Sequence, residues 1–336
     1  MSHLAASPAN AALPERLRAV EAAFRAANPK SEAAHLAALG PMPGGNTRSV
    51  LHFSPFPLSF AGGRGCWLED LDGHTLLDCL GEYSAGLYGH SEPVIQDAIR
   101  VALDDGIVLG GPNRYETALA AEICDRFPSI EQVRFTNSGT EANLLALAAA
   151  RLATDRQAVM VVDGGYHGGV LYFGREKSPL NVPGPWLCAS YNDVDATAAL
   201  IERHAGELAA ILLEPMLGSG GGICAAPAYL RMLREAADRH GIVLIFDEVM
   251  TSRMSRGGLQ QRLGITPDMT TLGKYLGGGL SFGAFGGKAS LMARFDPRRP
   301  DAVAHAGTFN NNVLSMAAGL AGLRHVLSGE RLEALW

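Results

Sequence analysis

One lysine, Lys274, lies in the stretch TLGKYLGGGLSFGAFGGK, which contains seven glycines. So many glycines predict little regular structure around this lysine, and they allow a backbone to approach a ligand closely. The stretch carries almost no charge, and a lysine in such a pocket has a depressed pKa that leaves its amine neutral and nucleophilic. The alternative is an exposed loop lysine. The composition favours a lysine that is used for its amine.

An acidic pair follows a run of apolar residues. The stretch IVLIFDEVM predicts a buried strand that ends in Asp247 and Glu248. Burying two carboxylates at the end of a strand costs free energy of desolvation, unless a cation nearby offsets that cost. The pair could cap the next helix, or Asp247 could face a cationic ring nitrogen. The motif taken alone leaves both readings open.

A third motif, RFTNSGTEANLLALAAAR, predicts a strand that ends at Asn137 and a helix that starts near Glu141. The N–H groups at a helix start, together with the hydroxyls of Ser138 and Thr140, form an anion site that suits phosphate. Thr140, Glu141 and Asn143 could equally form an ordinary helix cap. This motif alone favours the cap.

A fourth motif, DGGYHGG, places Tyr166 and His167 between glycine pairs just after the apolar run AVMVV. An aromatic ring at a strand end can stack on a planar ligand. A surface loop with a chance aromatic residue is the alternative, at about even odds.

The four motifs together suit one ligand. A phosphate would bind at Ser138–Thr140, a ring would stack on Tyr166, the ring nitrogen would meet Asp247 and an aldehyde would bond Lys274. This set describes pyridoxal 5'-phosphate, for which a lysine at the aldehyde and an Asp at the pyridinium nitrogen are expected.

Helical patterns alternate with short apolar runs from Pro93 onward, which predicts an α/β fold with a mostly parallel sheet covered on both faces. Ligands of such sheets bind at the carboxyl ends of the strands, where the four motifs fall.

Asp72-Gly73 predicts a hairpin turn between two short strands, and one or two helices are expected in 14–39. The expected helices are Pro93–Leu103, Tyr115–Arg126, Thr140–Leu152, Ala196–His204 and Pro227–Arg239; the expected strands are QVRFTN, AVMVVD, AAILLEP and IVLIFDEV.

Composition limits the class of protein. The 336 residues are 47% hydrophobic and 18% charged, which is typical of a globular protein with a large core. The net charge of −6 argues against nucleic-acid binding. No run reaches membrane-spanning length and no signal peptide is visible. Five scattered cysteines without a C-x-x-C pair favour reduced thiols, no metal site and a cytoplasmic location.

Six stretches, in order, carry a resemblance to a known family: NSGTEA, GGYHGG, LLEPM, LIFDEVMTSR, TLGKYLGGG and HAGTFNNN. With them the chain resembles the class III, fold-type I pyridoxal-phosphate aminotransferases over nearly its whole length. It resembles the glutamate-1-semialdehyde aminomutase branch, and within it the β-phenylalanine aminotransferases. PGGNTRSVLHFSPFPL, GEYSAGLYGHS and GTFNNN carry the closer match.

The resemblance implies a role for each matching position. Lys274 is the Schiff-base lysine, Asp247 pairs the pyridine nitrogen, and Arg48 of NTRSV clamps the substrate carboxylate, as guanidinium groups do. Without the resemblance, Arg48 would be taken for a loop arginine in a surface ion pair. The remaining cofactor-binding positions are Tyr166 and Val249 on the two ring faces, Ser138, Gly139 and Thr140 at the phosphate, His167, Glu214, and Thr308, which reaches the phosphate across a homodimer interface.

The resemblance also implies a domain organisation. Residues 1–90 form N-terminal helices and small-domain strands, 91–325 form the large cofactor-binding domain, and 326–336 begin a linker helix. Family chains usually continue into a small C-terminal domain, most of which would lie beyond Trp336. The uncovered apolar surface would favour aggregation.

The implied activity is transfer of the amino group of a β-amino acid, aromatic and similar to β-phenylalanine, to a 2-oxo acid such as 2-oxoglutarate or pyruvate. One alternative is a glutamate-1-semialdehyde 2,1-aminomutase, which uses the same cofactor residues. Another is a short form that binds the cofactor or dimerises without turnover. A dinucleotide-dependent dehydrogenase is disfavoured, because no G-x-G-x-x-G follows a strand in a βαβ unit.

Overall fold

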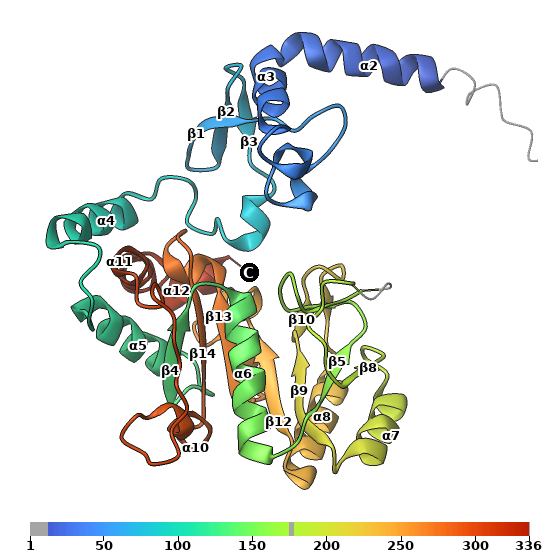
Figure 1. The fold of residues 1–336 in the computed structure, drawn as a ribbon, viewed down its shortest axis with the longest axis vertical. Helices are drawn as coiled ribbons and strands as arrows, with labels where there is room; N and C mark the ends of the chain where they lie inside the picture. The colour runs from blue at the N-terminus through green and yellow to red at the C-terminus, as the bar shows by residue number, and fades with distance from the viewer. Residues whose placement is uncertain (1–12, 175–177, 336) are drawn as a thin grey trace, which may run out of the picture. The chain divides into compact units, whose positions relative to one another are not determined.

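A computed structural model describes residues 13–174 and 178–335, which form two compact units (Figure 1). The smaller unit comprises Met1–Gly81 with Gly89–Ser91, and the larger unit comprises Glu82–Tyr88 with Glu92–Trp336. Residues 1–12 of the predicted N-terminal part and Trp336 of the predicted linker helix lie outside the described residues.

The smaller unit contains the two N-terminal helices and the hairpin that the sequence predicts. Pro29 begins the second helix, where a missing N–H costs nothing. The Asp70 carboxylate accepts hydrogen bonds from the N–H groups of Asp72 and His74, and so closes the turn. The elements are α2 (Leu13–Ala27), α3 (Pro29–Ala38), β2 (Trp67–Asp70), β3 (Thr75–Leu77) and a third antiparallel strand that was not predicted, β1 (Phe60–Arg64).

A seven-stranded sheet forms the centre of the larger unit, in the order β4-β14-β13-β12-β9-β5-β8. Only β14 runs antiparallel to its neighbours, so the predicted α/β fold with a mostly parallel sheet is confirmed. The strands are β4 (Gln132–Thr136), β5 (Ala158–Val162), β8 (Trp186–Ala189), β9 (Leu208–Leu213), β12 (Val243–Asp247), β13 (Met269–Gly273) and β14 (Gly283–Gly287).

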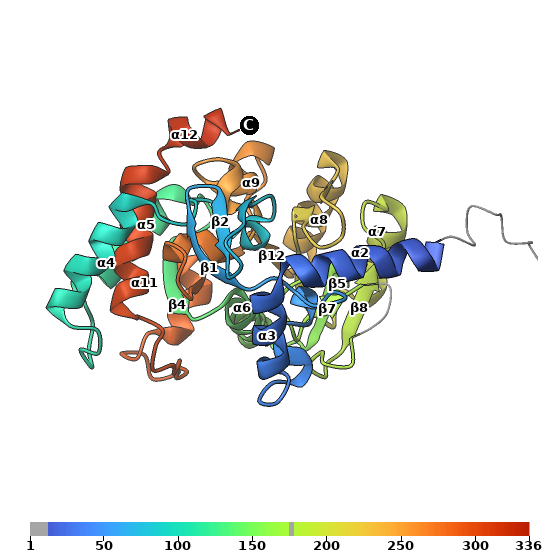
Figure 2. The same cartoon turned by 90° about the horizontal axis from the view of Figure 1, so that it is seen from above.

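Helices cover both faces of this sheet (Figure 1, Figure 2). Strand β12 is apolar on both sides: Val243 and Ile245 pack in the cluster with α6, and Leu244 and Phe246 pack in the cluster with α8. Burial on both faces is why such strands read as continuous apolar runs. All five predicted helices form, with ends within two residues of the prediction: α4 (Pro93–Asp105), α5 (Arg114–Arg126), α6 (Gly139–Thr154), α7 (Val194–His204) and α8 (Pro227–His240).

Shorter elements complete the larger unit. They include two small antiparallel pairs beside the main sheet and the helices that follow β12. Their bounds are β6 (Gly165–Tyr166), β7 (Tyr172–Phe173), β10 (Met216–Leu217), β11 (Ile223–Cys224), α9 (Gly258–Leu263), α10 (Ala289–Met292), α11 (Val313–Ala321) and α12 (Gly329–Ala334).

The expectation of little regular structure around Lys274 is wrong. The lysine follows buried strand β13 and opens the short 3-10 helix η5 (Lys274–Gly277), and β14 begins at Gly283, shortly after η5 ends. Glycines build this strand because neighbouring backbone lies too close for a side chain. A Cβ on Gly283 would lie 2.1 Å from the Ser138 carbonyl oxygen, and one on Gly286 would lie 2.6 Å from that of Gln132.

Two further searches concern only the part of the chain that the structure describes. There, no helix is both long enough and apolar enough to span a membrane. The same residues contain no group of three or more His, Cys, Asp or Glu side chains placed to hold a metal ion.

Candidate active site

The parallel strands of the larger unit bring most of the predicted site residues to one edge of the sheet. Asp247 is the last residue of β12, Glu214 follows β9, and Lys274 follows β13. Ser138 follows β4 and caps α6. Since parallel strands end at the same edge, residues far apart in the sequence meet there.

Asp247 is 4% exposed and accepts three hydrogen bonds. Its Oδ2 lies 2.8 Å from Asn143 Nδ2 and 2.8 Å from His167 Nδ1, and its Oδ1 lies 3.0 Å from the Val249 N–H. Three contacts on two oxygens leave the carboxylate little freedom to rotate. The Asp247 side chain is therefore held in a fixed orientation at the end of β12.

Glu248 resolves the open question about the acidic pair. Its carboxylate accepts hydrogen bonds from the N–H groups of Leu259 and Gln260 and from the Thr251 hydroxyl. It thereby binds the first turn of α9, while burial raises the pKa of this carboxyl. Glu248 is thus the helix-binding member of the pair, and Asp247 faces α6.

The ring of His167 is buried between Asp247 and the rest of the loop after β5, with 1% exposure. Its Nδ1 lies 2.8 Å from the Asp247 carboxylate, so we assign the proton of a neutral ring to Nδ1. Its Nε2 is buried and has no hydrogen-bond partner among the described residues. His167 therefore contacts the Asp247 carboxylate and helps to fix its orientation.

Asn143 is a site residue that the sequence analysis missed. Its Nδ2 donates to Asp247 Oδ2 and to the His167 carbonyl at 3.0 Å, and its Oδ1 accepts from the Thr271 hydroxyl at 2.7 Å. Both Asn143 and Thr271 are buried. An asparagine among the apolar residues of a helix interior is unfavourable without such a partner, and that is the signal that could have revealed it.

The start of α6 is capped, as the simpler interpretation predicted, but by Ser138 and Glu141, and Asn143 takes no part. Ser138 Oγ accepts from the Glu141 N–H at 3.2 Å, and Glu141 Oε2 accepts from the Asn137 N–H at 2.9 Å. The cap does not use Thr140. The first turn of a helix still presents N–H groups that lack intrahelical partners, so an anion can bind there as well.

Glycines bring the other loops against this helix start. A Cβ on Gly139 would lie 2.8 Å from Val249 Cγ2, and one on Gly273 would lie 3.2 Å from Val249 Cγ1. A Cβ on Gly168 would lie 2.0 Å from Thr140 Oγ1. The backbone before Lys274, the loop of His167 and the segment after Asp247 therefore all contact the first residues of α6.

Lys274 has a left-handed backbone with φ of 55°, which a non-glycine residue adopts only at a cost. Burial lowers the pKa of its amine, while the charges of Asp247 and Glu214 oppose this change. At a given pH a larger share of the amine is therefore neutral than in an exposed lysine. The chemistry expected from the sequence, a nucleophilic amine beside a carboxylate, is possible here.

Glu214 binds the backbone of the loop that carries Tyr166. Its Oε2 accepts from the Tyr166 N–H at 2.9 Å, and its Oε1 accepts from the Gly218 N–H at 3.0 Å. Burial, and next the charge of Asp247, raise the pKa of the Glu214 carboxyl. The Tyr166 side chain is 43% exposed, and its ring packs edge-on with that of Tyr172.

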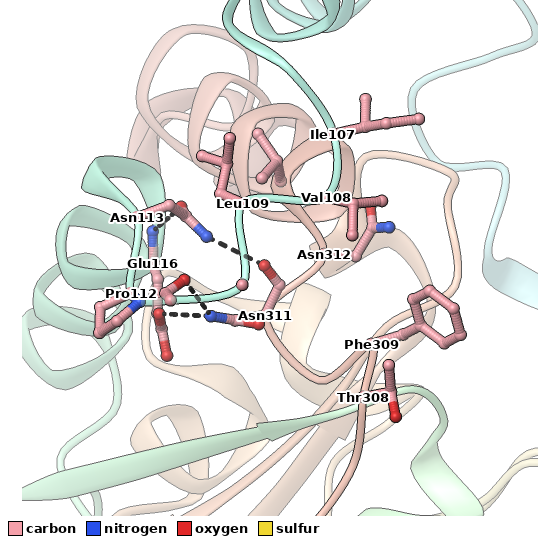
Figure 3. Close-up of a pocket in the computed structure, with 13 residues that line it drawn as sticks. Ile107, Val108, Leu109, Pro112, Asn113, Glu116, Thr308, Phe309, Asn311 and Asn312 are labelled. Atoms are coloured by element: carbon pink, nitrogen blue, oxygen red, sulfur yellow. Dashed lines mark hydrogen bonds between the residues drawn. The ribbon is translucent and has the colours of Figure 1, made fainter.

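Two predicted residues are not in this group. Thr308 lies on an exposed segment and lines a cavity of about 440 Å³ together with residues 107–113 (Figure 3). Arg48 is exposed in the smaller unit, just before the 3-10 helix η2 (Ser49–Leu51).

The grouped residues fit pyridoxal phosphate. Gly139 and Gly168 let the Val249 and Thr140 side chains lie against the start of α6, because a Cβ at either position would clash with them. Asp247 supplies an anion for a protonated ring nitrogen, and Lys274 supplies an amine with a lowered pKa. The donor set is thus right for a phosphate, a pyridinium ring and an aldehyde.

Comparison with known proteins gives a consistent family assignment. The model of the family described as aminotransferase class-III matches residues 52–173 and 186–334. The β-phenylalanine transaminase of Variovorax paradoxus is 53% identical over 97% of this chain, which spans 75% of that protein. A glutamate-1-semialdehyde 2,1-aminomutase of Rhodopirellula baltica is 40% identical over 94% of this chain and 75% of its own length.

Solved structures agree with these relatives. The crystal structure of a β-phenylalanine aminotransferase from Variovorax paradoxus superposes with a TM-score of 0.93 at 53% identity, over 96% of this chain and 75% of that chain. A transaminase with bound pyridoxal phosphate superposes with a TM-score of 0.84 at 33% identity, over 89% of this chain and 74% of that chain.

Proposed function

The chain belongs to the class III aminotransferases, and from this premise we propose that it transfers the amino group of an aromatic β-amino acid to a 2-oxo acid. The observation that carries the proposal is the half-buried Lys274 directly after β13, whose amine is under the influence of the Asp247 and Glu214 carboxylates. The substrate class follows the Variovorax paradoxus relative, which is named for β-phenylalanine.

Pyridoxal phosphate is the cofactor of this family, and when bound it accepts the electron pair of the carbon that carries the amino group. Ser138, Gly139 and Thr140 would hold its phosphate, and Tyr166 and Val249 would contact the two faces of its ring. Asp247, fixed by Asn143 and His167, would hold a proton on the ring nitrogen.

Lys274 would have two tasks. It would hold the cofactor through its amine, and it would also be the base that takes the proton from the substrate carbon that bears nitrogen. Burial lowers the pKa of this amine, which suits a base that must be unprotonated at neutral pH. Glu214 would hold the Tyr166 backbone in place during both steps.

Arg48 would bind the carboxylate of the substrate through its guanidinium group, which pairs with carboxylates in a bidentate manner. Arg48 is an exposed residue of the smaller unit. Its role rests on the NTRSV motif and can be tested independently of the cofactor residues.

The active form would be a homodimer in which Thr308 of one protomer reaches the phosphate of the other. Support comes from the apolar side chains that the segments around the Figure 3 cavity expose. Val108 is 79% exposed and Phe309 is 59% exposed, although both are large and apolar. Exposed apolar patches of this kind mark interfaces.

The test is an assay of product formation. Purified protein with pyridoxal phosphate, β-phenylalanine and 2-oxoglutarate or pyruvate should form glutamate or alanine, and Lys274→Ala should abolish this product. Lys30→Ala, which changes an exposed lysine of the smaller unit, should not. Turnover that survives in Lys274→Ala would refute the role of this lysine.

The aminomutase relative supplies the second candidate. Conversion of glutamate 1-semialdehyde without any 2-oxo acid, and no reaction of β-phenylalanine with one, would favour the mutase over the transaminase. Cofactor binding without either reaction would favour a form that lacks turnover.

A further inference from the structure

A hydrogen bond joins two segments that are 173 positions apart and that the proposed function uses separately. Asn310 Oδ1 accepts from Asn137 Nδ2 at 3.1 Å. Asn137 directly follows β4 and precedes the start of α6 that would bind phosphate, and its N–H donates to Glu141 Oε2 at 2.9 Å. Asn310 belongs to the segment HAGTFNNN, which carries Thr308.

The orientation of both amides is fixed by their partners. The Glu141 carboxylate only accepts, so Asn137 must present its NH₂ group and Asn310 its oxygen. The NH₂ group of Asn310 then points to His305 Nε2 at 3.1 Å, which must accept. Burial, and next the charge of Arg134, lower the pKa of His305, which favours the neutral ring that this bond needs.

The turn that presents Thr308 is built around the Asn310 side chain. The Asn310 N–H donates to the Gly307 carbonyl at 3.2 Å, and a Cβ on Gly307 would lie 2.3 Å from Asn310 Nδ2. Gly307 has a φ of 156°, which few other residues adopt. Thr308 and Phe309 form the exposed tip between these two anchors.

The next two asparagines fix the far side of the same segment (Figure 3). Asn311 Nδ2 donates to Glu116 Oε2 at 3.0 Å, and its carbonyl accepts from Asn113 Nδ2 at 3.0 Å. Asn312 caps α11 by accepting from the N–H groups of its first turn. Asn310 is therefore the member of the run that connects the tip to the phosphate end of the site.

We infer that Asn310 is a positioning residue for phosphate binding. It ties the tip that carries Thr308, which would reach the phosphate of the partner protomer, to the residue before Ser138–Thr140 of its own chain. In the proposed homodimer each Asn310 side chain would thus position one part of each of the two phosphate sites. The inference rests on the proposed function for the roles of Thr308 and α6. Asn310 would contact neither the phosphate nor the substrate. It would act through the two segments that it joins, the Thr308 tip and the start of α6.

The test compares two ligands of the apoprotein, pyridoxal phosphate and pyridoxal, which lacks the phosphate. Asn310→Ala should weaken pyridoxal phosphate binding about tenfold, the size expected for loss of an aligned charged-ligand contact. Pyridoxal binding at Lys274 should stay unchanged. Equal weakening of both ligands, or of neither, would overturn the inference.

Two further variants protect the result against a simple folding defect. Asn137→Ala removes the other end of the bond, and the effects of Asn137→Ala and Asn310→Ala on the ratio of the two affinities should be less than additive. Asn312→Ala removes a helix cap in the same segment, so it should lower Tm and leave the ratio unchanged. Full additivity would contradict the inference. A wild-type protein that binds both ligands without transamination would contradict the proposed function alone.

Discussion

At the scale of single residues, contacts within the protein fix the orientation of the Asp247 carboxylate. Asn143, His167 and the Val249 N–H all donate to it, and Thr271 in turn donates to Asn143. A carboxylate held this way keeps its direction whether or not a ligand is present. The strength of the contact with a ring nitrogen should therefore depend on residues that never touch the ring.

Asn143→Ala tests this dependence. It removes one donor to a buried charge, and such bonds contribute about 1.5–3 kcal/mol, so kcat should fall by roughly tenfold or more. Thr271→Val keeps the shape of its side chain and loses only the hydroxyl that orients Asn143, so it should give a smaller loss in the same direction. Steady-state kinetics at saturating pyridoxal phosphate measure both. Unchanged kcat in Asn143→Ala would show that the contact is only structural.

The amine of Lys274 gives a pH-dependent prediction. Burial lowers its pKa from the ordinary 10.5, and only the neutral amine attacks an aldehyde. Cofactor uptake by the apoprotein should therefore accelerate as pH rises and level off below pH 10.5. The Glu214 carboxylate favours the charged amine, so Glu214→Gln should move the midpoint to lower pH. Stopped-flow absorbance measures the rate, and a midpoint that moves upward would contradict the assigned cause.

Residue types and strand ends were enough to place Lys274 and Asp247 at the carboxyl end of the sheet, because a lysine or an acid at the end of a buried strand is unusual in itself. They were not enough for Asn143 and Thr271. These two meet across 128 positions, and only the packing of α6 on β13 brings them together. The different partners of the acidic pair, Asn143 for Asp247 and the start of α9 for Glu248, likewise depend on packing that the motif alone does not show.

At the scale of elements, three strands of the main sheet were not predicted, β8, β13 and β14. Glycines are depleted in strands, so GAFGG of β14 did not read as one. Here the glycines are needed because β14 lies between β4 and β13 with neighbouring backbone in close contact. The five predicted helices and the strands β4, β5, β9 and β12, in contrast, follow from apolar patterns that do not depend on such contacts.

Gly283→Ala tests the close approach. Its Cβ would lie 2.1 Å from the Ser138 carbonyl oxygen, so β14 or the start of α6 must shift. The free energy of unfolding should fall by about 1–3 kcal/mol, and pyridoxal phosphate should bind more weakly. Gly206→Ala is the matched control, since a Cβ there meets nothing within 4 Å. Denaturant unfolding measures the stability of both variants, and equal stability of Gly283→Ala and Gly206→Ala would contradict the account.

At the scale of the whole molecule, the proposed homodimer accounts for apolar side chains that are otherwise exposed. Val108 lies on the segment that lines the Figure 3 cavity and is exposed in the single chain. Val108→Asp should convert the dimer to monomers, because association would bury a charge. Leu180→Asp, which changes an exposed leucine that does not line the cavity, should leave the dimer intact.

Sedimentation velocity over a range of concentrations distinguishes these outcomes. A dimeric wild type, a monomeric Val108→Asp and a dimeric Leu180→Asp are expected. A wild-type protein that is monomeric at every concentration would contradict the role of Thr308 across an interface. The roles proposed for Lys274 and Asp247 would not depend on that result.

The central claim is that Lys274 is the residue that bonds the cofactor beside Asp247. The most direct measurement is borohydride reduction of the pyridoxal-phosphate-loaded protein, followed by peptide mapping by mass spectrometry. We predict a single modified peptide, with the added pyridoxyl phosphate on Lys274. Modification of another lysine in its place, or of none, would contradict the account.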